Sequence, residues 1–222
     1  MILDNGLNKI PDALIFDMDG TLWDAVGTYT LAWNRYFEEQ GIGTRLLKKD
    51  LDNLMGLEEH AFLEKVLPEF TPDERAMRYK EVIQLQYDLI DHQGGIIYEG
   101  VLEYLPLLRR HFKLFIVSNC PKYTIRHFMK FAQIEPFICD SLSHGQNYRP
   151  KHENIRKLMQ RHRLVSPVYI GDTESDRKQS EMADIPFVFM GYGFGSCEQA
   201  ETSFDSFEEF AIHFLHLANK NN

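Results

Sequence analysis

The sequence predicts an α/β protein, a doubly wound parallel sheet in a three-layer α/β/α arrangement with an inserted bundle of helices. Short apolar runs alternate with helical patterns along most of the chain, as is typical of parallel strands covered on both faces. Residues 17–113 separate the first run from the second. Such a connection is far longer than an ordinary crossover with loops of ~2–6 residues and one helix, so it indicates an insertion.

The predicted strands are continuous apolar runs at residues 13–16, 114–117, 137–139, 168–170 and 187–190. Apolar periodicity predicts the accompanying helices at residues 102–111, 122–131, 152–161, 176–183 and 207–217. The last residues, 218–222, are expected to fray.

The insertion has the pattern of a small helical bundle. An aromatic stripe from Tyr29 to Phe37 predicts one helix, which ends at Gly41. Thr71 to Glu74 form a capping box with proline in the first turn, and this second helix stops at Gly94. Shorter helices are expected at 46–54 and 58–67. We therefore expect a core domain of residues 1–22 and 96–222 and a helical cap of residues 23–95.

Composition and charge narrow the possible partners and location. Hydrophobic residues make up 44% and charged residues 26%, with a net charge of -9. This acidic balance argues against a nucleic acid or an anionic membrane as partner. The longest apolar runs are far too short to span a membrane, and Met1 to Pro11 lacks the pattern of a signal peptide. Three widely spaced cysteines favour a reducing compartment, so a cytoplasmic protein is expected.

Polar side chains follow several of the predicted strands. Asp17 and Asp19 come directly after the first strand and point the same way in extended backbone, and Gly20 permits a sharp turn. In a doubly wound sheet, the first and fourth strands are neighbours where the winding reverses, and ligands bind beyond their carboxyl ends. Asp172 and Asp176 follow the fourth strand, so these carboxylates would crowd one crevice. Hard oxygen ligands in such a cluster favour Mg2+.

Together with Ser118 after the second strand and Lys151 at a helix start, the segments Asp17 to Leu22 and Gly171 to Asp176 resemble the four ordered motifs of the haloacid dehalogenase superfamily. The helical insertion is similar to the cap of its phosphoglycolate-phosphatase-like members. The resemblance covers nearly the whole chain. It implies a Mg2+-dependent phosphatase that acts on a small phosphorylated metabolite.

The resemblance also implies a role for each matched residue. Asp17 would be the nucleophile that forms an aspartyl-phosphate, and Asp19 the general acid and then the general base. Lys151 would neutralise charge on the phosphate and on Asp17. Hydrogen bonds to the phosphoryl group or nucleophile are expected from Thr21, Ser118 and Asn119. Mg2+ would bind Asp17, the backbone carbonyl of Asp19, and Asp172, with Asp176 ligating directly or through water.

Plainer interpretations stand beside these roles. A calcium loop starting at Asp17 would need glycine at its sixth position and glutamate at its twelfth, where the chain has Leu22 and Thr28. Asp172 and Asp176 also suit a helix N-cap with an acidic first turn, which does not exclude metal binding. The glycine-rich segment 191–195 has the wrong spacing for a dinucleotide site and is expected to be a loop near the active site.

Several functions remain open. A phosphomutase would use the same Asp17 and Mg2+ but return the phosphoryl group to a sugar. A dehalogenase is disfavoured because Asp19 is present, and a non-catalytic phosphate-binding protein is disfavoured because the whole polar set is retained. The cap loop 53–57 is expected to set specificity for a small substrate such as phosphoglycolate or a sugar phosphate.

Overall fold

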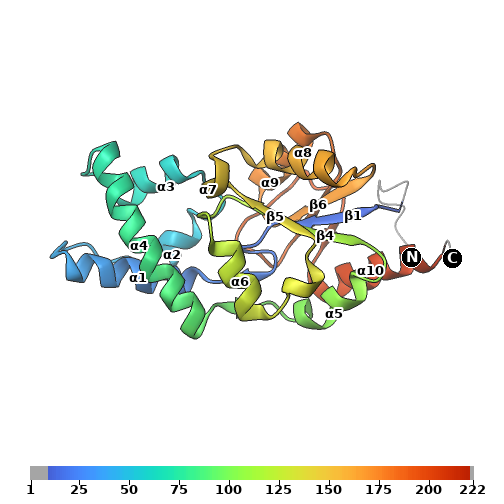
Figure 1. The fold of residues 1–222 in the computed structure, drawn as a ribbon, viewed down its shortest axis with the longest axis horizontal. Coiled ribbons are helices and arrows are strands. Elements are labelled where there is room, and N and C mark those ends of the chain that lie inside the picture. The colour runs from blue at the N-terminus through green and yellow to red at the C-terminus, as the bar shows by residue number, and fades with distance from the viewer. Residues whose placement is uncertain (1–9, 221–222) are drawn as a thin grey trace.

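The fold is built around a six-stranded parallel sheet in a computed structural model that describes residues 10–220 (Figure 1). Strand β1 lies in the interior of the sheet and pairs with β4 on one side and β6 on the other. The spatial order is β5-β4-β1-β6-β7-β8. The strands are β1 (Ala13–Phe16), β4 (Lys113–Ser118), β5 (Asp140–Ser143), β6 (Pro167–Gly171), β7 (Phe187–Met190) and β8 (Ser203–Phe204).

Helices cover both faces of this sheet, as Figure 1 shows. The four residues of β1 are all fully buried, and successive side chains point to opposite faces of the sheet. Both faces must therefore be covered. Leu14 and Phe16 pack in one core cluster, where Phe16 contacts Phe210 with ring centroids 5.8 Å apart. Ala13 and Ile15 pack in the other. The helices are α5 (Val101–Leu108), α6 (Thr124–Ala132) and α10 (Phe207–Asn219) on the first face, and α8 (Lys151–His162) and α9 (Glu174–Ala183) on the second.

The winding of the sheet reverses beside β1. From β1 the chain passes to β4 and then β5 on one side, and then crosses to β6, β7 and β8 on the other. The predicted neighbourhood of the first and fourth strands is therefore confirmed. Ligands of such sheets bind beyond the carboxyl ends of strands at the reversal point.

The insertion leaves and rejoins the core through two short antiparallel strands, β2 (Trp23–Asp24) and β3 (Ile96–Ile97). The insertion lies beside the sheet, at the end away from helix α10 (Figure 1). Its longest helix begins with the predicted Thr71 capping box and Pro72, and Trp33 stacks on Tyr79 with centroids 6.1 Å apart. The helices are α1 (Val26–Glu39), α2 (Lys48–Asp52), α3 (Glu59–Val66) and α4 (Pro72–Gln93).

One predicted strand was wrong. Residues 137–139 do not form a strand; Glu135–Phe137 is a short 3-10 helix (η1), and β5 follows at Asp140–Ser143. The apolar side chains of Phe137 and Ile138 pack against the edge of the core instead. An edge strand such as β5 needs no continuous apolar run, because it is not enclosed as a central strand is.

The other predicted helices and strands of the core are present, with ends shifted by a few residues. The chain also forms β8 and the short helix α7 (His144–Asn147), which were not predicted. Helix α10 continues to Asn219, so the predicted fraying is wrong for residues 218–219. Residues 221–222 lie outside the described part. Most of the segment Met1 to Pro11 also lies outside it. Within residues 10–220, the helices include none with the length and apolarity that crossing a membrane requires.

Candidate active site

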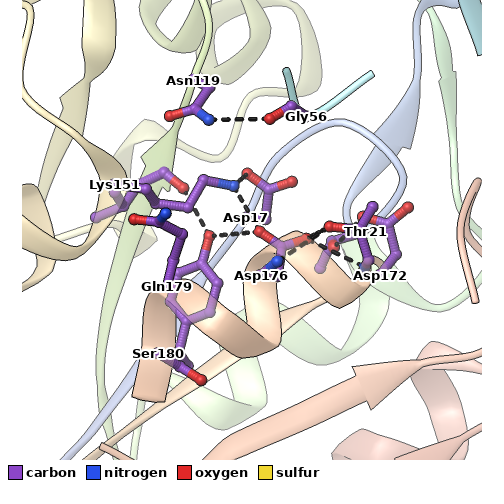
Figure 2. A network of polar contacts seen from close by, with 12 residues as sticks. Asp17, Thr21, Gly56, Asn119, Lys151, Asp172, Asp176, Gln179 and Ser180 are labelled. Carbon is purple, nitrogen blue, oxygen red and sulfur yellow. Dashed lines mark hydrogen bonds and ion pairs between the residues drawn. The ribbon is translucent and has the colours of Figure 1, made fainter. Parts of the chain in front are cut away.

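The polar residues predicted for the site meet at the carboxyl ends of β1, β4 and β6. Asp17 follows β1, Ser118 is the last residue of β4, and Asp172 follows β6. Lys151 is the first residue of α8, as predicted. Figure 2 shows Lys151 extended toward Asp17 and Asp176, with Asp172 beside them.

Lys151 is the centre of a buried charge network. Its Nζ lies 2.9 Å from Oδ1 of Asp17 and 2.6 Å from Oδ1 of Asp176. Only 2% of Lys151 is exposed. Burial alone would lower the pKa of Lys151, but the two carboxylates outweigh it and hold that pKa well above its usual value. The lysine is therefore a fixed positive charge next to Asp17.

Three buried carboxylates lie close enough to hold a metal ion. Asp17, Asp172 and Asp176 each offer an oxygen, and these oxygens lie within 4.8 Å of one another. Burial raises the pKa of Asp17 to about 6 despite Lys151. Burial, with Asp176 and Asp17 adding repulsion, raises the pKa of Asp172 well above its usual value. A divalent cation with a preference for oxygen ligands would relieve this repulsion, so the donor set fits Mg2+.

The three carboxylates differ in how many lone pairs their protein partners use. Oδ1 of Asp176 accepts from Lys151 and, at 3.5 Å, from Tyr169, while Oδ2 accepts from the backbone N and the hydroxyl of Thr173. The hydroxyl of Tyr169 lies closer to the carbonyl oxygen of Val117, at 3.1 Å, so three of the about four lone-pair sites of Asp176 have a firm donor. Within residues 10–220, Asp172 has one side-chain or backbone donor on each oxygen, and the side-chain donor to Asp17 is Lys151.

Thr173 and Asp176 also form the capping box of α9, in which Thr173 is the N-cap. The plain interpretation of this segment is thus correct, with the cap one residue later than Asp172. The same carboxylate caps the helix and holds Lys151. Asp176 connects the start of α9 to the polar network.

Asp172 is enclosed by glycines that permit close backbone approach. A Cβ on Gly193 would lie 2.2 Å from Cβ of Asp172, and one on Gly20 would lie 2.1 Å from its Oδ2. The backbone N of Phe194 donates to Oδ2 of Asp172 at 2.8 Å, and the hydroxyl of Thr21 donates to Oδ1 at 3.4 Å. The glycine-rich segment 191–195 therefore holds Asp172 in place, and its predicted position near the site is confirmed.

The surroundings of Asp19 suit a proton donor. Burial and the nearby Asp17 raise the pKa of Asp19 to about 7. The hydroxyl of Tyr29, from α1 of the insertion, donates to Oδ1 of Asp19 at 3.0 Å. A residue of the insertion thus directly contacts the loop after β1.

A cavity of about 70 Å³ lies between these core residues and the insertion. One water needs ~10–15 Å³ on this measure, so the space suits a small molecule. The predicted loop 53–57 contributes Leu54 to Leu57, and Nδ2 of Asn119 donates to the carbonyl of Gly56 at 3.0 Å, which joins insertion and core (Figure 2). The core side is lined by Asp17, Asp19, Ser118, Asn119, Cys120, Pro121 and Lys151.

The predicted site residues thus fall into two groups. Asp17, Asp19, Ser118, Asn119 and Lys151 line the cavity, whereas Thr21, Asp172 and Asp176 lie behind them. Sequence reasoning missed several residues. For Tyr29 and Tyr79, the sequence shows only that they belong to the apolar stripes of two helices. Nothing in the sequence points to the remaining residues, which are Glu59, Gln86, Tyr169 and Thr173.

Comparison with known proteins agrees with this geometry. The model of the haloacid dehalogenase-like hydrolase family matches residues 14–190. The chain belongs to that family. A comparison with curated proteins gives no match.

Solved structures show the same fold over nearly the whole chain. A predicted phosphatase from Clostridium acetobutylicum is 19% identical, with a TM-score of 0.77 over 94% of this chain and 100% of that one. A predicted phosphoglycolate phosphatase from Haemophilus somnus is 17% identical, with a TM-score of 0.80 over 97% and 100%. CbbY from Rhodobacter sphaeroides, in complex with xylulose 1,5-bisphosphate, is 14% identical, with a TM-score of 0.77 over 90% and 96%.

Proposed function

We propose that the protein is a Mg2+-dependent phosphatase that hydrolyses a small phosphate ester through an aspartyl-phosphate on Asp17. The observation that carries this proposal is the pairing of Asp17 with the buried Lys151 at the wall of a small cavity. Family membership supports a hydrolase. The carboxylate cluster at the same place supports a metal ion.

In the first step, an Asp17 oxygen attacks phosphorus and the bond from phosphorus to the leaving oxygen breaks. Asp19 gives its proton to that oxygen, a role that its raised pKa suits. In the second step, Asp19 takes a proton from water, which attacks phosphorus and releases phosphate and free Asp17. Lys151 offsets the negative charge that accumulates in both steps.

Mg2+ would be held by Asp17, Asp172 and the backbone carbonyl of Asp19. The contacts that Asp176 already makes to Lys151 and Thr173 favour a role in positioning Lys151, with its link to the ion made through water. When bound, the ion would neutralise charge on the phosphoryl group. Thr21 would support Asp172, while Ser118 and Asn119, which line the cavity, would bind the phosphoryl oxygens.

We further propose that residues 23–95 act as a cap over a core of residues 1–22 and 96–222. The paired strands β2 and β3 support this division, since they bring both connections together. A cap excludes water and selects the substrate. A cytoplasmic location is part of the proposal and is supported by three free cysteines.

Two substrate types, phosphoglycolate and a sugar phosphate, suit the size of the cavity. A phosphomutase is the second candidate, and one observation favours it: CbbY, which shares the fold, is bound to a sugar bisphosphate. A non-catalytic binding protein is the remaining alternative. It would have no use for a lysine fixed against the nucleophile.

The proposal is tested by phosphate release from a panel of small phosphate esters, with Mg2+ and with EDTA, for wild type and Asp17→Asn. We expect release that requires Mg2+ and is lost in the variant, whose thermal unfolding shows that the fold is intact. Release unaffected by EDTA would contradict the metal requirement. Interconversion of sugar phosphates with a bisphosphate activator, without release, would favour the mutase.

A further inference from the structure

The cap side of the cavity carries polar side chains that no protein group satisfies. Gln86 is a residue that is only 5% exposed, and its side chain makes no hydrogen bond within residues 10–220, yet its amide is not sealed inside the protein and so faces the space of the cavity. The same holds for Tyr79, a residue that is 8% exposed, and for its hydroxyl. Buried polar groups are normally hydrogen-bonded. Both side chains line the cavity, so a ligand there can supply the missing partners.

Glu59 brings a negative charge to the same wall. It is half-buried and lines the cavity, and it makes no ion pair within residues 10–220. Lys80 and His144 lie close enough to oppose the effect of burial on Glu59, but neither makes an ion pair with it. Burial raises the pKa of Glu59 because its carboxylate loses hydration. A carboxylate in this position favours a partner that donates hydrogen bonds.

Positive charge is scarce in this cavity. Among its described lining residues, Lys151 is the one cation, against the carboxylates of Asp17, Asp19 and Glu59. Lys151 is already held by Asp17 and Asp176. A leaving group with its own carboxylate would therefore meet Glu59, and the one cation in the described lining, Lys151, is already paired.

We infer that this wall of Glu59, Tyr79 and Gln86 selects phosphate esters whose leaving group carries hydrogen-bond donors, hydroxyl or ammonium, and no negative charge. The inference rests on the proposed phosphatase function and chooses between the two substrate types left open there: polyol-like or amino esters are preferred over phosphoglycolate. The apolar side chains of Leu54, Met55 and Phe62 limit such a leaving group to a few carbon atoms.

The test compares three esters of nearly equal size that differ in one group: 2-phosphoglycolate, 2-hydroxyethyl phosphate and phosphoethanolamine. The unselective ester p-nitrophenyl phosphate is assayed beside them. We expect kcat/KM for the better of the two donor esters to exceed that for phosphoglycolate by about tenfold or more, since like charges a few ångströms apart repel strongly in a poorly solvated site. Which of the two is better identifies the donor.

Two variants connect this preference to the cap wall. Glu59→Gln should reduce the preference about tenfold, because it removes the repelling charge and keeps the side-chain shape. Glu58→Gln is the matched control, because it removes the same charge one residue away. Glu58 is exposed and lies outside the cavity. Thermal unfolding of both variants confirms that they fold.

Three outcomes would overturn the inference: a preference for phosphoglycolate in wild type, a preference for donor esters that Glu59→Gln leaves unchanged, or one that both variants change equally. In each case, hydrolysis of p-nitrophenyl phosphate would still uphold the proposed function. If none of the four esters is hydrolysed, the proposed function fails and the inference fails with it.

Discussion

The two sides of the cavity differ in how their polar groups are satisfied. On the core side, Lys151 contacts two carboxylates and Asp176 also accepts from Thr173, while Oδ1 of Asn119 is the buried core-side atom in the described lining that has no partner. On the cap side, Gln86 and Glu59 have no partner within residues 10–220. A satisfied network holds groups rigidly for chemistry that does not depend on the leaving group, whereas unsatisfied groups leave room for a particular ligand. We therefore attribute the chemical steps to the core and the selection of the substrate to the cap.

Disrupting the charge network of the core should have the largest effect on stability and activity. Lys151→Met would leave Asp17 and Asp176 buried without their cation, and breaking a buried pair costs about 3 kcal/mol or more. We expect that loss in the free energy of unfolding, measured by urea denaturation, and a loss of activity of at least about a hundredfold. Lys157→Met, on an exposed position of the same helix, should change stability by less than ~0.5 kcal/mol. Equal stability of the two variants would show that the network is not a structural unit.

The next largest effect is expected on metal affinity. Gly193→Ala would force a methyl group into Asp172, because the new Cβ would lie 2.2 Å from Cβ of that residue. Disturbing groups that orient a metal ligand typically costs ~10–100-fold in affinity. Mg2+ titration calorimetry should show weaker binding in this range. Gly43→Ala, where no atom lies within 4 Å of the new Cβ, serves as control and should bind Mg2+ like wild type.

A smaller effect is expected where cap and core meet. Tyr29→Phe removes the hydrogen bond to Asp19 and keeps the ring. A hydrogen bond to a charged group contributes ~1.5 kcal/mol at the lower end of its usual range, and this end corresponds to a fall in kcat of about tenfold. Tyr104→Phe, which removes a 2.7 Å hydrogen bond to Glu208 between α5 and α10, should leave kcat unchanged. An unchanged kcat in Tyr29→Phe would show that the cap does not assist Asp19.

The smallest effect should come from the cap wall. Gln86→Met keeps the length of the side chain and removes an amide that lines the cavity and makes no hydrogen bond within residues 10–220. Replacing such a group by an apolar one is close to neutral, so the free energy of unfolding should change by no more than ~0.5 kcal/mol. A large loss of stability in urea denaturation would mean that Gln86 supports the fold, and the contrast with Lys151 would fail.

The same contrast explains what could be predicted from the sequence. Asp17, Asp19, Asp172 and Asp176 could be found because parallel strands bring their carboxyl ends to one edge, so position after a strand predicts position in space. Glu59 and Gln86 could not, because their place in the cavity depends on how α3 and α4 pack over the core. Nothing local in the sequence distinguishes them from other polar helix residues.

The errors in the fold have a similar cause. Strand β5 lies at the edge of the sheet and is Asp-Ser-Leu-Ser, so the apolar pattern predicts a strand in the run just before it instead. Strand β8 has only two residues, too few for any periodicity. Central strands, by contrast, are enclosed on both faces and carry the continuous apolar pattern that predicts them.

The account is tested most directly by locating the covalent phosphate. Wild-type protein turning over p-nitrophenyl phosphate with Mg2+ is quenched in acid, digested, and examined by mass spectrometry. We predict phosphate on the peptide that contains Asp17, with the modification at that side chain. Phosphate on a different residue would contradict the role of Asp17 as nucleophile and, with it, the division of labour between core and cap.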